Sequence, residues 1–201
     1  MKVGVMASGR GSNFQAIIDA GIRNETPDVE IVQLVVNKPG VGAIQHAEKN
    51  NIPYEVIDSS KMSREEFDEK TIEIFEEKEI EVVVLAGFMR ILTPVFITKY
   101  KDKILNIHPS LLPAFPGSQA HKDTIAYGAK ISGCTAHLVD EGVDSGPIIM
   151  QSAIQIDENE TENSLSKKIL IHEHKILPQT LQLLCSNKII LEGRKVRIKS
   201  D

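Results

Sequence analysis

Short apolar runs alternate with amphipathic stretches along much of the chain. The apolar residues 1–6 are followed by SGRGSN and then by a segment with apolar positions at helical spacing: Phe14, Ile17, Ile18 and Ile22. This order predicts a strand, a tight turn and a helix. Further runs with the length of strands occupy residues 30–37, 54–58, 81–88 and 103–107. Because buried parallel strands have such runs and helical stretches mostly separate them, the pattern predicts an α/β fold with a doubly wound, mostly parallel sheet.

Two sequence signals mark helix starts in the middle of the chain. Ser63 and Glu66 have the spacing of a capping box, which predicts a helix over about 64–79. Thr93 followed by Pro94 predicts a second, short helix.

The pattern changes after residue 130. Two longer apolar runs, 132–139 and 147–156, flank the segment DEGVDSG, which predicts an antiparallel hairpin appended to the parallel part. A long amphipathic helix over 164–185 then closes the fold, and Pro178 is expected to kink or divide it. The chain has 201 residues, of which 41% are hydrophobic, so we expect a single domain over residues 1–201.

Charge and cysteine content narrow the functional class. The net charge is −5 and the 23 basic residues are scattered, so we expect no binding to nucleic acid. Cys134 and Cys185 fit no metal spacing and are too few for a disulfide framework, which favours buried thiols in a reducing compartment. The apolar run at 82–89 is too short to cross a bilayer, and the chain begins without a charged leader. We therefore expect a soluble, cytoplasmic protein with no membrane partner.

The glycine-rich turn at residues 8–13 is a candidate phosphate site. A turn between a strand and a helix presents backbone N–H groups and the positive end of the helix dipole. Phe14 occupies the position of the third glycine of a dinucleotide fingerprint, Asn37 replaces the acidic residue that contacts ribose, and GSN replaces the GK[ST] of a P-loop. With dinucleotides and nucleoside triphosphates disfavoured, the candidate ligand is a terminal monophosphate held at Gly11, Ser12 and Asn13. The alternative is a turn whose glycines only permit close packing.

The stretch KILNIHPSLLPAFPG, residues 103–117, contains the candidate catalytic residues. Asn106 and His108 are two positions apart in a predicted strand, so both side chains lie on one face and can stabilise a developing oxyanion. Asp144, in the hairpin loop, is a candidate for orienting His108 and favouring its charged form. The sequence does not show whether Asp144 lies close to His108. Each residue alone also has an ordinary structural interpretation. Asn106 could satisfy a strand end, His108 could be a buried polar residue with its hydrogen bonds satisfied, and Asp144 could simply form a turn.

Other clusters have weaker support. His172, Glu173 and His174 resemble metal ligands, but in a helix the two histidines are about 200° apart around the axis, so we expect no metal site. The chain has no GxSxG and no nucleophilic cysteine signature. Direct attack by a bound substrate is therefore favoured over a covalent acyl-enzyme.

Four segments, in their order and spacing, resemble the folate-dependent phosphoribosylglycinamide formyltransferases: SGRGSNFQAI, VVVLAGFMRIL, LNIHPSLLPAFPG and GVDSGPII. The resemblance covers about residues 2–185. It implies a Rossmann-like formyltransferase fold and the transfer of a formyl group from 10-formyltetrahydrofolate, a co-substrate, to the amine of glycinamide ribonucleotide in purine biosynthesis. It further implies that Asn106 and His108 stabilise the oxyanion with support from Asp144.

The resemblance also implies binding roles. Gly11, Ser12 and Asn13 would hold the ribonucleotide phosphate, and Glu173 would contact its glycinamide end. The folate would be lined by Met89, Arg90, Ile91, Leu92 and Asn106, with the 139–144 loop, including Val139 and Asp140, opposite. Arg64 would meet the carboxylate tail of the folate. Two positions depart from the family: Gln119 replaces a common histidine, and Leu138 stands where an aromatic residue is usual.

Three alternatives remain open on the sequence. A formyl-folate deformylase would use the same Asn, His and Asp with water as nucleophile, but those relatives carry an additional regulatory domain before the catalytic one. A formyltransferase for initiator tRNA would be expected to carry a further carboxy-terminal domain and a basic surface. A non-catalytic phosphate-binding α/β module would bind no folate. The oligomeric state has no signal in the sequence.

Overall fold

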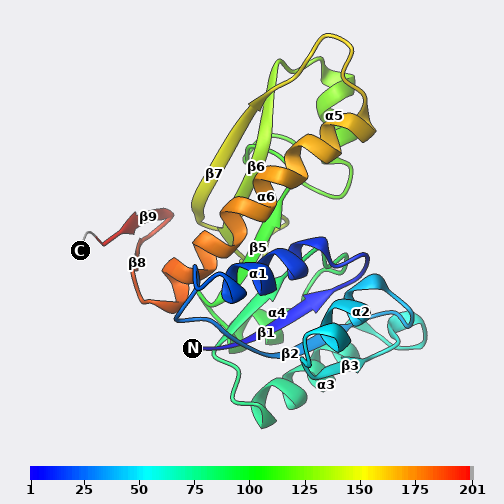
Figure 1. The fold of residues 1–201 in the computed structure, drawn as a ribbon, viewed down its shortest axis with the longest axis vertical. Coiled ribbons are helices and arrows are strands. Elements are labelled where there is room, and N and C mark those ends of the chain that lie inside the picture. Colours follow the sequence, from blue (N-terminus) through cyan, green and yellow to red (C-terminus); the bar gives the residue numbers. More distant parts are fainter. Residues whose placement is uncertain (200–201) are drawn as a thin grey trace.

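The computed structural model describes residues 1–199, which form a mixed α/β structure (Figure 1). In chain order the elements are β1 (Lys2–Ala7), α1 (Ser12–Ile22), β2 (Glu30–Val36), α2 (Gly42–Lys49), β3 (Tyr54–Val56), the 3-10 helix η1 (Ser59–Lys61), α3 (Arg64–Glu77), β4 (Val82–Leu85), α4 (Pro94–Lys99), β5 (Ile104–His108), α5 (Ala120–Tyr127), β6 (Ile131–Leu138), β7 (Ile148–Gln155), α6 (Glu162–Cys185), β8 (Ile189–Glu192) and β9 (Lys195–Ile198). The helix starts at Ser63 and Thr93 are confirmed, because each side chain caps the first turn of its helix.

Seven strands form one sheet in the order β3-β2-β1-β4-β5-β6-β7. The pairs from β3 to β5 are parallel, whereas β5 with β6 and β6 with β7 are antiparallel. The β6–β7 hairpin and the first part of α6 extend beyond the parallel part of the sheet (Figure 1). The predicted doubly wound sheet, appended hairpin and closing helix are thus confirmed.

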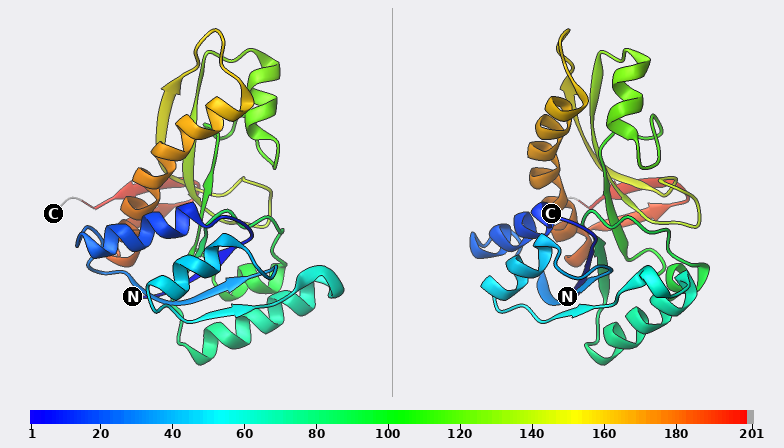
Figure 2. Two further views of the ribbon diagram at one scale, coloured as in Figure 1. Left: turned by 45° about the vertical axis from the view of Figure 1, so that its right-hand side comes forward. Right: turned by 90° about the vertical axis from the view of Figure 1, so that its right-hand side faces the viewer.

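Helices cover both faces of the sheet and define two parts of the core (Figure 2). On one face α1, α2 and α6 pack against alternate strand residues, with Phe14 and Leu165 fully buried. On the other face α3 and α4 form an aromatic cluster, in which the Phe75 ring packs edge-on against Phe96 and Tyr100. Both free cysteines are buried, as expected.

Several local expectations need correction. Pro178 does not divide the closing helix, which is continuous from Glu162 to Cys185. The sequence analysis missed the short, largely polar helices α2 and α5 and the hairpin β8–β9, which turns at Gly193 with a φ of 62°. The two helices lack an apolar face of clear helical spacing, and the two strands of the hairpin are only four residues long. No helix within residues 1–199 has the length and apolar character needed to cross a membrane.

Candidate active site

The predicted site residues gather at the carboxyl edge of the parallel strands. Because β1, β4 and β5 are adjacent and parallel, the loops that follow them lie on the same edge of the sheet. Two hydrogen bonds join the first two of these loops: Ser8 N donates to the Gly87 carbonyl at 3.2 Å, and Met89 N donates to Ser8 Oγ at 2.9 Å. This is the edge at which doubly wound α/β proteins bind their ligands.

Asn106 and His108 lie on the same face of β5. Ile104 belongs to the core on the α3 and α4 side, whereas Leu105 and Ile107 pack on the opposite face. Strand alternation therefore places Asn106 and His108 on the side of Ile104, as predicted. The two side chains contact two loops on this face: His108 contacts the loop after β5, and Asn106 contacts the loop between β6 and β7.

Asp144 lies within reach of both residues, although it is far from them in the sequence. His108 Nδ1 is 3.2 Å from Asp144 Oδ2, and Asn106 Nδ2 is 3.5 Å from Asp144 Oδ1. Gly117 N donates to Asp144 Oδ2 at 2.8 Å. Asp144 has a φ of 50°, a left-handed conformation that aspartate tolerates better than most residues. The two side chains on β5 thus converge on one carboxylate.

Both ring nitrogens of the buried His108 face hydrogen-bond acceptors. Nδ1 faces the Asp144 carboxylate, and Nε2 lies 2.8 Å from the Phe115 carbonyl oxygen. A neutral imidazole donates from one nitrogen only, whereas the imidazolium donates from both. Both acceptors can therefore be bonded at once only by an imidazolium, and the Phe115 carbonyl fixes the orientation of the ring.

His137 is a member of the site that the sequence analysis missed. It is the cross-strand partner of Asn106 in the β5–β6 pair. His137 Nδ1 lies 2.9 Å from the Leu138 carbonyl and Nε2 lies 3.1 Å from Asn106 Nδ2. Burial lowers the pKa of His137, which favours the neutral ring. In the tautomer that satisfies both contacts, Nδ1–H donates to the carbonyl and Nε2 accepts from Asn106. The antiparallel register that creates this contact has no signature in the sequence.

A second hydrogen-bond network, which the sequence did not predict, connects the loop after β5 to the β6–β7 hairpin. Thr135 Oγ1 donates to the Ser110 carbonyl at 2.7 Å and accepts from Leu112 N at 3.0 Å. Gln151 Nε2 donates to the Leu112 carbonyl at 2.9 Å. These bonds fix the start of the loop that carries Phe115 and Gly117 to the active-site face.

The glycine turn forms the amino terminus of α1. Gly11 is the N-cap residue with a φ of 77°, and Ser12 and Asn13 are the first residues of the helix. A Cβ atom on Gly11 would lie 2.6 Å from the Cα of Ala43 at the start of α2. Glycine is therefore required both by the backbone conformation and by the close approach of α2. The first amide groups of α1 have no partner within the helix and can bind an anion.

Asn13 and Glu173 are joined across the α1–α6 contact. Asn13 Nδ2 donates to Glu173 Oε2 at 2.8 Å, and both side chains are buried. Burial raises the pKa of Glu173, and the bond from Asn13 offsets this in part. Asn13 Oδ1 is buried and has no hydrogen-bond partner in the described part of the chain. A buried acceptor without a partner is costly and can be satisfied by a ligand.

The residues expected to line the folate differ in what they offer. The side chains of Met89 and Ile91 are 73% and 57% exposed, whereas Leu92 is buried in the core and can contribute its backbone alone. Arg90 is turned toward α3: its guanidinium lies 5.1 Å above the Phe67 ring and 3.4 Å from the Ser63 carbonyl.

Three further residues are expected to contact the folate: Arg64, Val139 and Asp140. Arg64 is the exposed first residue of α3. Val139 is partly buried, and the Asp140 carboxylate bonds within its own loop, to Gly142 N and Ser145 Oγ. The side chain of Asp140 is thus occupied in shaping the loop.

The two histidines that flank Glu173 lie in different surroundings. His172 Nδ1 lies 2.7 Å from Ser152 Oγ on β7, whereas burial lowers the pKa of His174 and Asp19 on α1 counteracts this. Within residues 1–199 no group of three or more His, Cys, Asp or Glu side chains is arranged to hold a metal ion.

Known proteins share this architecture and sequence. The chain is 44% identical over 190 residues to the trifunctional purine biosynthetic protein adenosine-3 of Gallus gallus; the alignment covers 94% of this chain and 19% of that protein. The chain thus spans about a fifth of such relatives. It is 41% identical over 184 residues to the phosphoribosylglycinamide formyltransferase of Bacillus subtilis (strain 168), covering 91% of this chain and 94% of that protein.

Comparison with solved structures identifies the same kind of protein as the sequence relatives. The crystal structure of glycinamide ribonucleotide transformylase 1 from Symbiobacterium toebii superimposes with a TM-score of 0.97 and 36% identity, covering 100% of this chain and 94% of that one. The formyl transferase family matches residues 1–181. The chain therefore belongs to the formyl transferase family, and the relatives whose length it nearly matches are phosphoribosylglycinamide formyltransferases.

Proposed function

We propose that this chain transfers the formyl group of 10-formyltetrahydrofolate to the amine of glycinamide ribonucleotide. The observation that carries the proposal is the convergence of Asn106 Nδ2 and His108 Nδ1 on the Asp144 carboxylate at the carboxyl edge of the sheet. Family membership and the names of the full-length relatives support the same reaction.

The proposed chemistry is direct attack by the substrate amine. The amine nitrogen forms a bond to the formyl carbon, and the carbonyl oxygen becomes an oxyanion. Asn106 donates a hydrogen bond to this oxygen. The His108 imidazolium, whose Nε2–H is held by the Phe115 carbonyl, donates to the oxygen from Nδ1–H, which in the free site faces Asp144. Asp144 stays beside the ring as its counter-ion. The amine then loses a proton, the folate nitrogen gains one, and the carbon–nitrogen bond to the folate breaks. Preorganised donors of this kind supply about 2.7–4 kcal/mol each in other acyl-transfer sites.

Asn106 is prepared for this role by His137. The His137 Nε2 lone pair accepts one amide hydrogen of Asn106, which fixes the direction of the Asn106 Nδ2 group. The second hydrogen of that group points toward Asp144 at the longer distance of 3.5 Å. This weaker contact is the one that an oxyanion would replace.

The acceptor would be held by α1 and α6. We propose that the amides of Gly11, Ser12 and Asn13 bind the phosphate, because a helix amino terminus favours an anion. The unpartnered Asn13 Oδ1 and the Glu173 carboxylate offer acceptors for the N–H groups of the glycinamide.

The folate would contact the loop after β4. The exposed Met89 and Ile91 provide apolar surface for its ring system, with the backbone of residues 89–92 and the loop at Val139 and Asp140 alongside. Arg64, exposed at the start of α3, is placed to meet an acidic tail. We expect no metal to take part.

One assay tests the proposal against the hydrolase alternative. Purified protein is mixed with 10-formyltetrahydrofolate, and release of tetrahydrofolate is followed with and without glycinamide ribonucleotide. We expect release that depends on the acceptor and yields formylglycinamide ribonucleotide. Equal release without the acceptor would show a hydrolase, and no binding of folate by calorimetry would show a non-catalytic module.

A further inference from the structure

The last hairpin of the chain contacts the loop that carries Asp144. Arg194, at the turn between β8 and β9, donates from Nη2 to the Ser145 carbonyl at 2.7 Å. Ser145 directly follows Asp144 in the loop between β6 and β7, and β9 lies beside β7 (Figure 2). The hairpin lies beyond residues 1–181, the part of the chain that matches the formyl transferase family.

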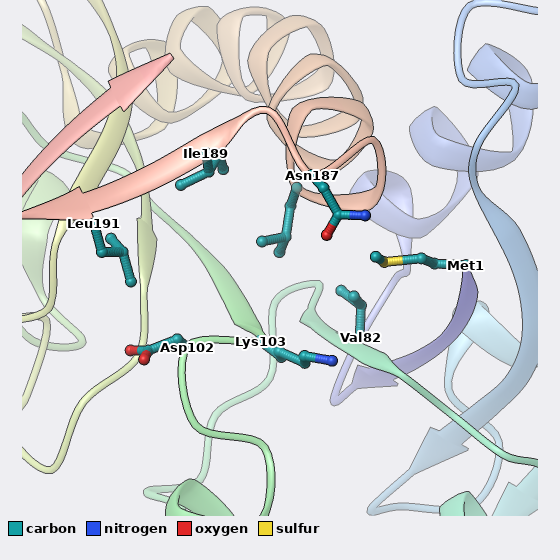
Figure 3. Close-up of a pocket in the computed structure, with 8 residues that line it drawn as sticks. Met1, Val82, Asp102, Lys103, Asn187, Ile189 and Leu191 are labelled. Atoms are coloured by element: carbon teal, nitrogen blue, oxygen red, sulfur yellow. The ribbon is translucent and has the colours of Figure 1, made fainter. Parts of the chain in front are cut away.

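One end of the hairpin lies near the sheet edge opposite to the active site. Ile189 and Leu191 of β8 face Met1 and Val82 across a cavity of about 240 Å³ (Figure 3). Val82 begins β4, so this cavity lies at the amino ends of the parallel strands. The hairpin thus reaches from the far edge of the sheet to the catalytic loop.

Both ends of the 139–147 loop are held by backbone hydrogen bonds to strands, from Val139 N to the Ile104 carbonyl and from Leu138 N to the Pro147 carbonyl, each at 2.9 Å. Between these ends the loop is held by side-chain contacts. Asp140 Oδ1 accepts hydrogen bonds from Gly142 N and from Ser145 Oγ, at 3.1 and 2.5 Å. The Asp144 carboxylate is held by Gly117 N, which belongs to another loop. Arg194 is exposed, and it adds a charged donor from a separate, hydrogen-bonded element. Charge strengthens such a bond and solvent weakens it, so a moderate contribution is expected.

We propose that the β8–β9 hairpin braces the catalytic loop and that Arg194 is a positioning residue, which holds the Ser145 carbonyl and thereby keeps Asp144 in reach of His108 and Asn106. This inference rests on the proposed formyl transfer. Asp144 has a left-handed backbone, and such a residue keeps its conformation when its surroundings hold it there. The bonded carbonyl belongs to the peptide group between Ser145 and Gly146, so the bond restrains the segment that directly follows Asp144.

The test compares Arg194→Ala with Arg197→Ala in the full chain. Arg197 is on the same hairpin, is exposed and pairs with Glu192 at 2.9 Å, so its loss removes the same charge without touching the loop. Arg194→Lys keeps a cation that can donate to the same carbonyl. For each variant, amide hydrogen exchange of residues 139–147 is measured without substrate, and kcat, KM and the melting temperature are measured separately.

We expect Arg194→Ala to raise exchange in the loop about fivefold and to lower kcat about fivefold, with KM for glycinamide ribonucleotide changed less than twofold. Arg194→Lys should restore most of kcat, and Arg197→Ala should match the parent. The inference is overturned if the two alanine variants behave alike, or if exchange rises while kcat does not fall. If the parent protein itself transfers no formyl group, the proposed function fails, and the exchange comparison alone decides whether the brace exists.

Discussion

Asn106 on β5 and His137 on β6 are cross-strand partners, and the amide nitrogen of one lies 3.1 Å from Nε2 of the other. Because His137 Nδ1–H is committed to the Leu138 carbonyl, Nε2 acts as an acceptor. This acceptor orients the Asn106 amide with its nitrogen, rather than its oxygen, toward Asp144. The proposed oxyanion donor is therefore oriented by a buried histidine on the neighbouring strand.

Replacing His137 with alanine should lower kcat about five- to thirtyfold, equivalent to roughly 1–2 kcal/mol, because the Asn106 amide is then free to rotate. His137→Gln should retain more activity, since its side-chain oxygen can accept from Asn106. Steady-state kinetics of both variants test this, with His172→Ala as a control for loss of a histidine outside the candidate site. Equal loss in the glutamine and alanine variants would contradict an acceptor role.

Asn106→Ala and His108→Ala should each reduce kcat by about a hundredfold or more, because each removes one donor to the oxyanion. The double variant should lose less than the product of the two effects, since both donors act on one oxygen. Single-turnover formyl transfer measures the chemical step directly. Turnover within threefold of the parent in either single variant would remove that residue from the mechanism.

The parallel part of the fold was predictable because its signals are local. The strands from β1 to β5 are apolar runs, and Ser63 and Thr93 mark helix starts with side-chain caps that form within one turn. The hairpin β8–β9 was missed because its strands alternate exposed and half-buried residues and contain several charges. Pro178 suggested a break, yet tertiary packing of α6 on the sheet keeps the helix continuous.

The candidate site was predictable only in part, for a related reason. Asn106 and His108 share a face because alternate residues of any strand do so. The contact of Asp144 with them depends on the path of the 139–147 loop, and the contact of His137 depends on the register of β5 with β6. Both are tertiary properties that residue spacing does not encode. The roles of the folate-lining residues remain predictions from resemblance.

Glu173→Gln should change the pH dependence of stability. Burial raises the pKa of Glu173 above its ordinary value of 4.5 in the folded protein, so the folded state favours the protonated form. The parent should therefore lose stability as the pH rises from about 4.5 through the raised folded value, whereas the glutamine variant should not. Urea unfolding at pH 4, 6 and 8 measures this difference. A stability difference independent of pH would show that burial does not dominate at this carboxyl.

Gly11→Ala separates the two interpretations of the glycine turn. The added methyl group would meet Ala43 at 2.6–2.8 Å in a left-handed backbone, so we expect a stability loss of about 1–3 kcal/mol. If the turn binds phosphate, KM for glycinamide ribonucleotide should rise at least about tenfold while KM for the folate changes little. Gly9→Ala is the matched control, because a methyl group there meets nothing within 4 Å. A loss of stability with an unchanged KM for the ribonucleotide would mean that the glycine serves packing of α2 against α1 and that the phosphate is bound elsewhere.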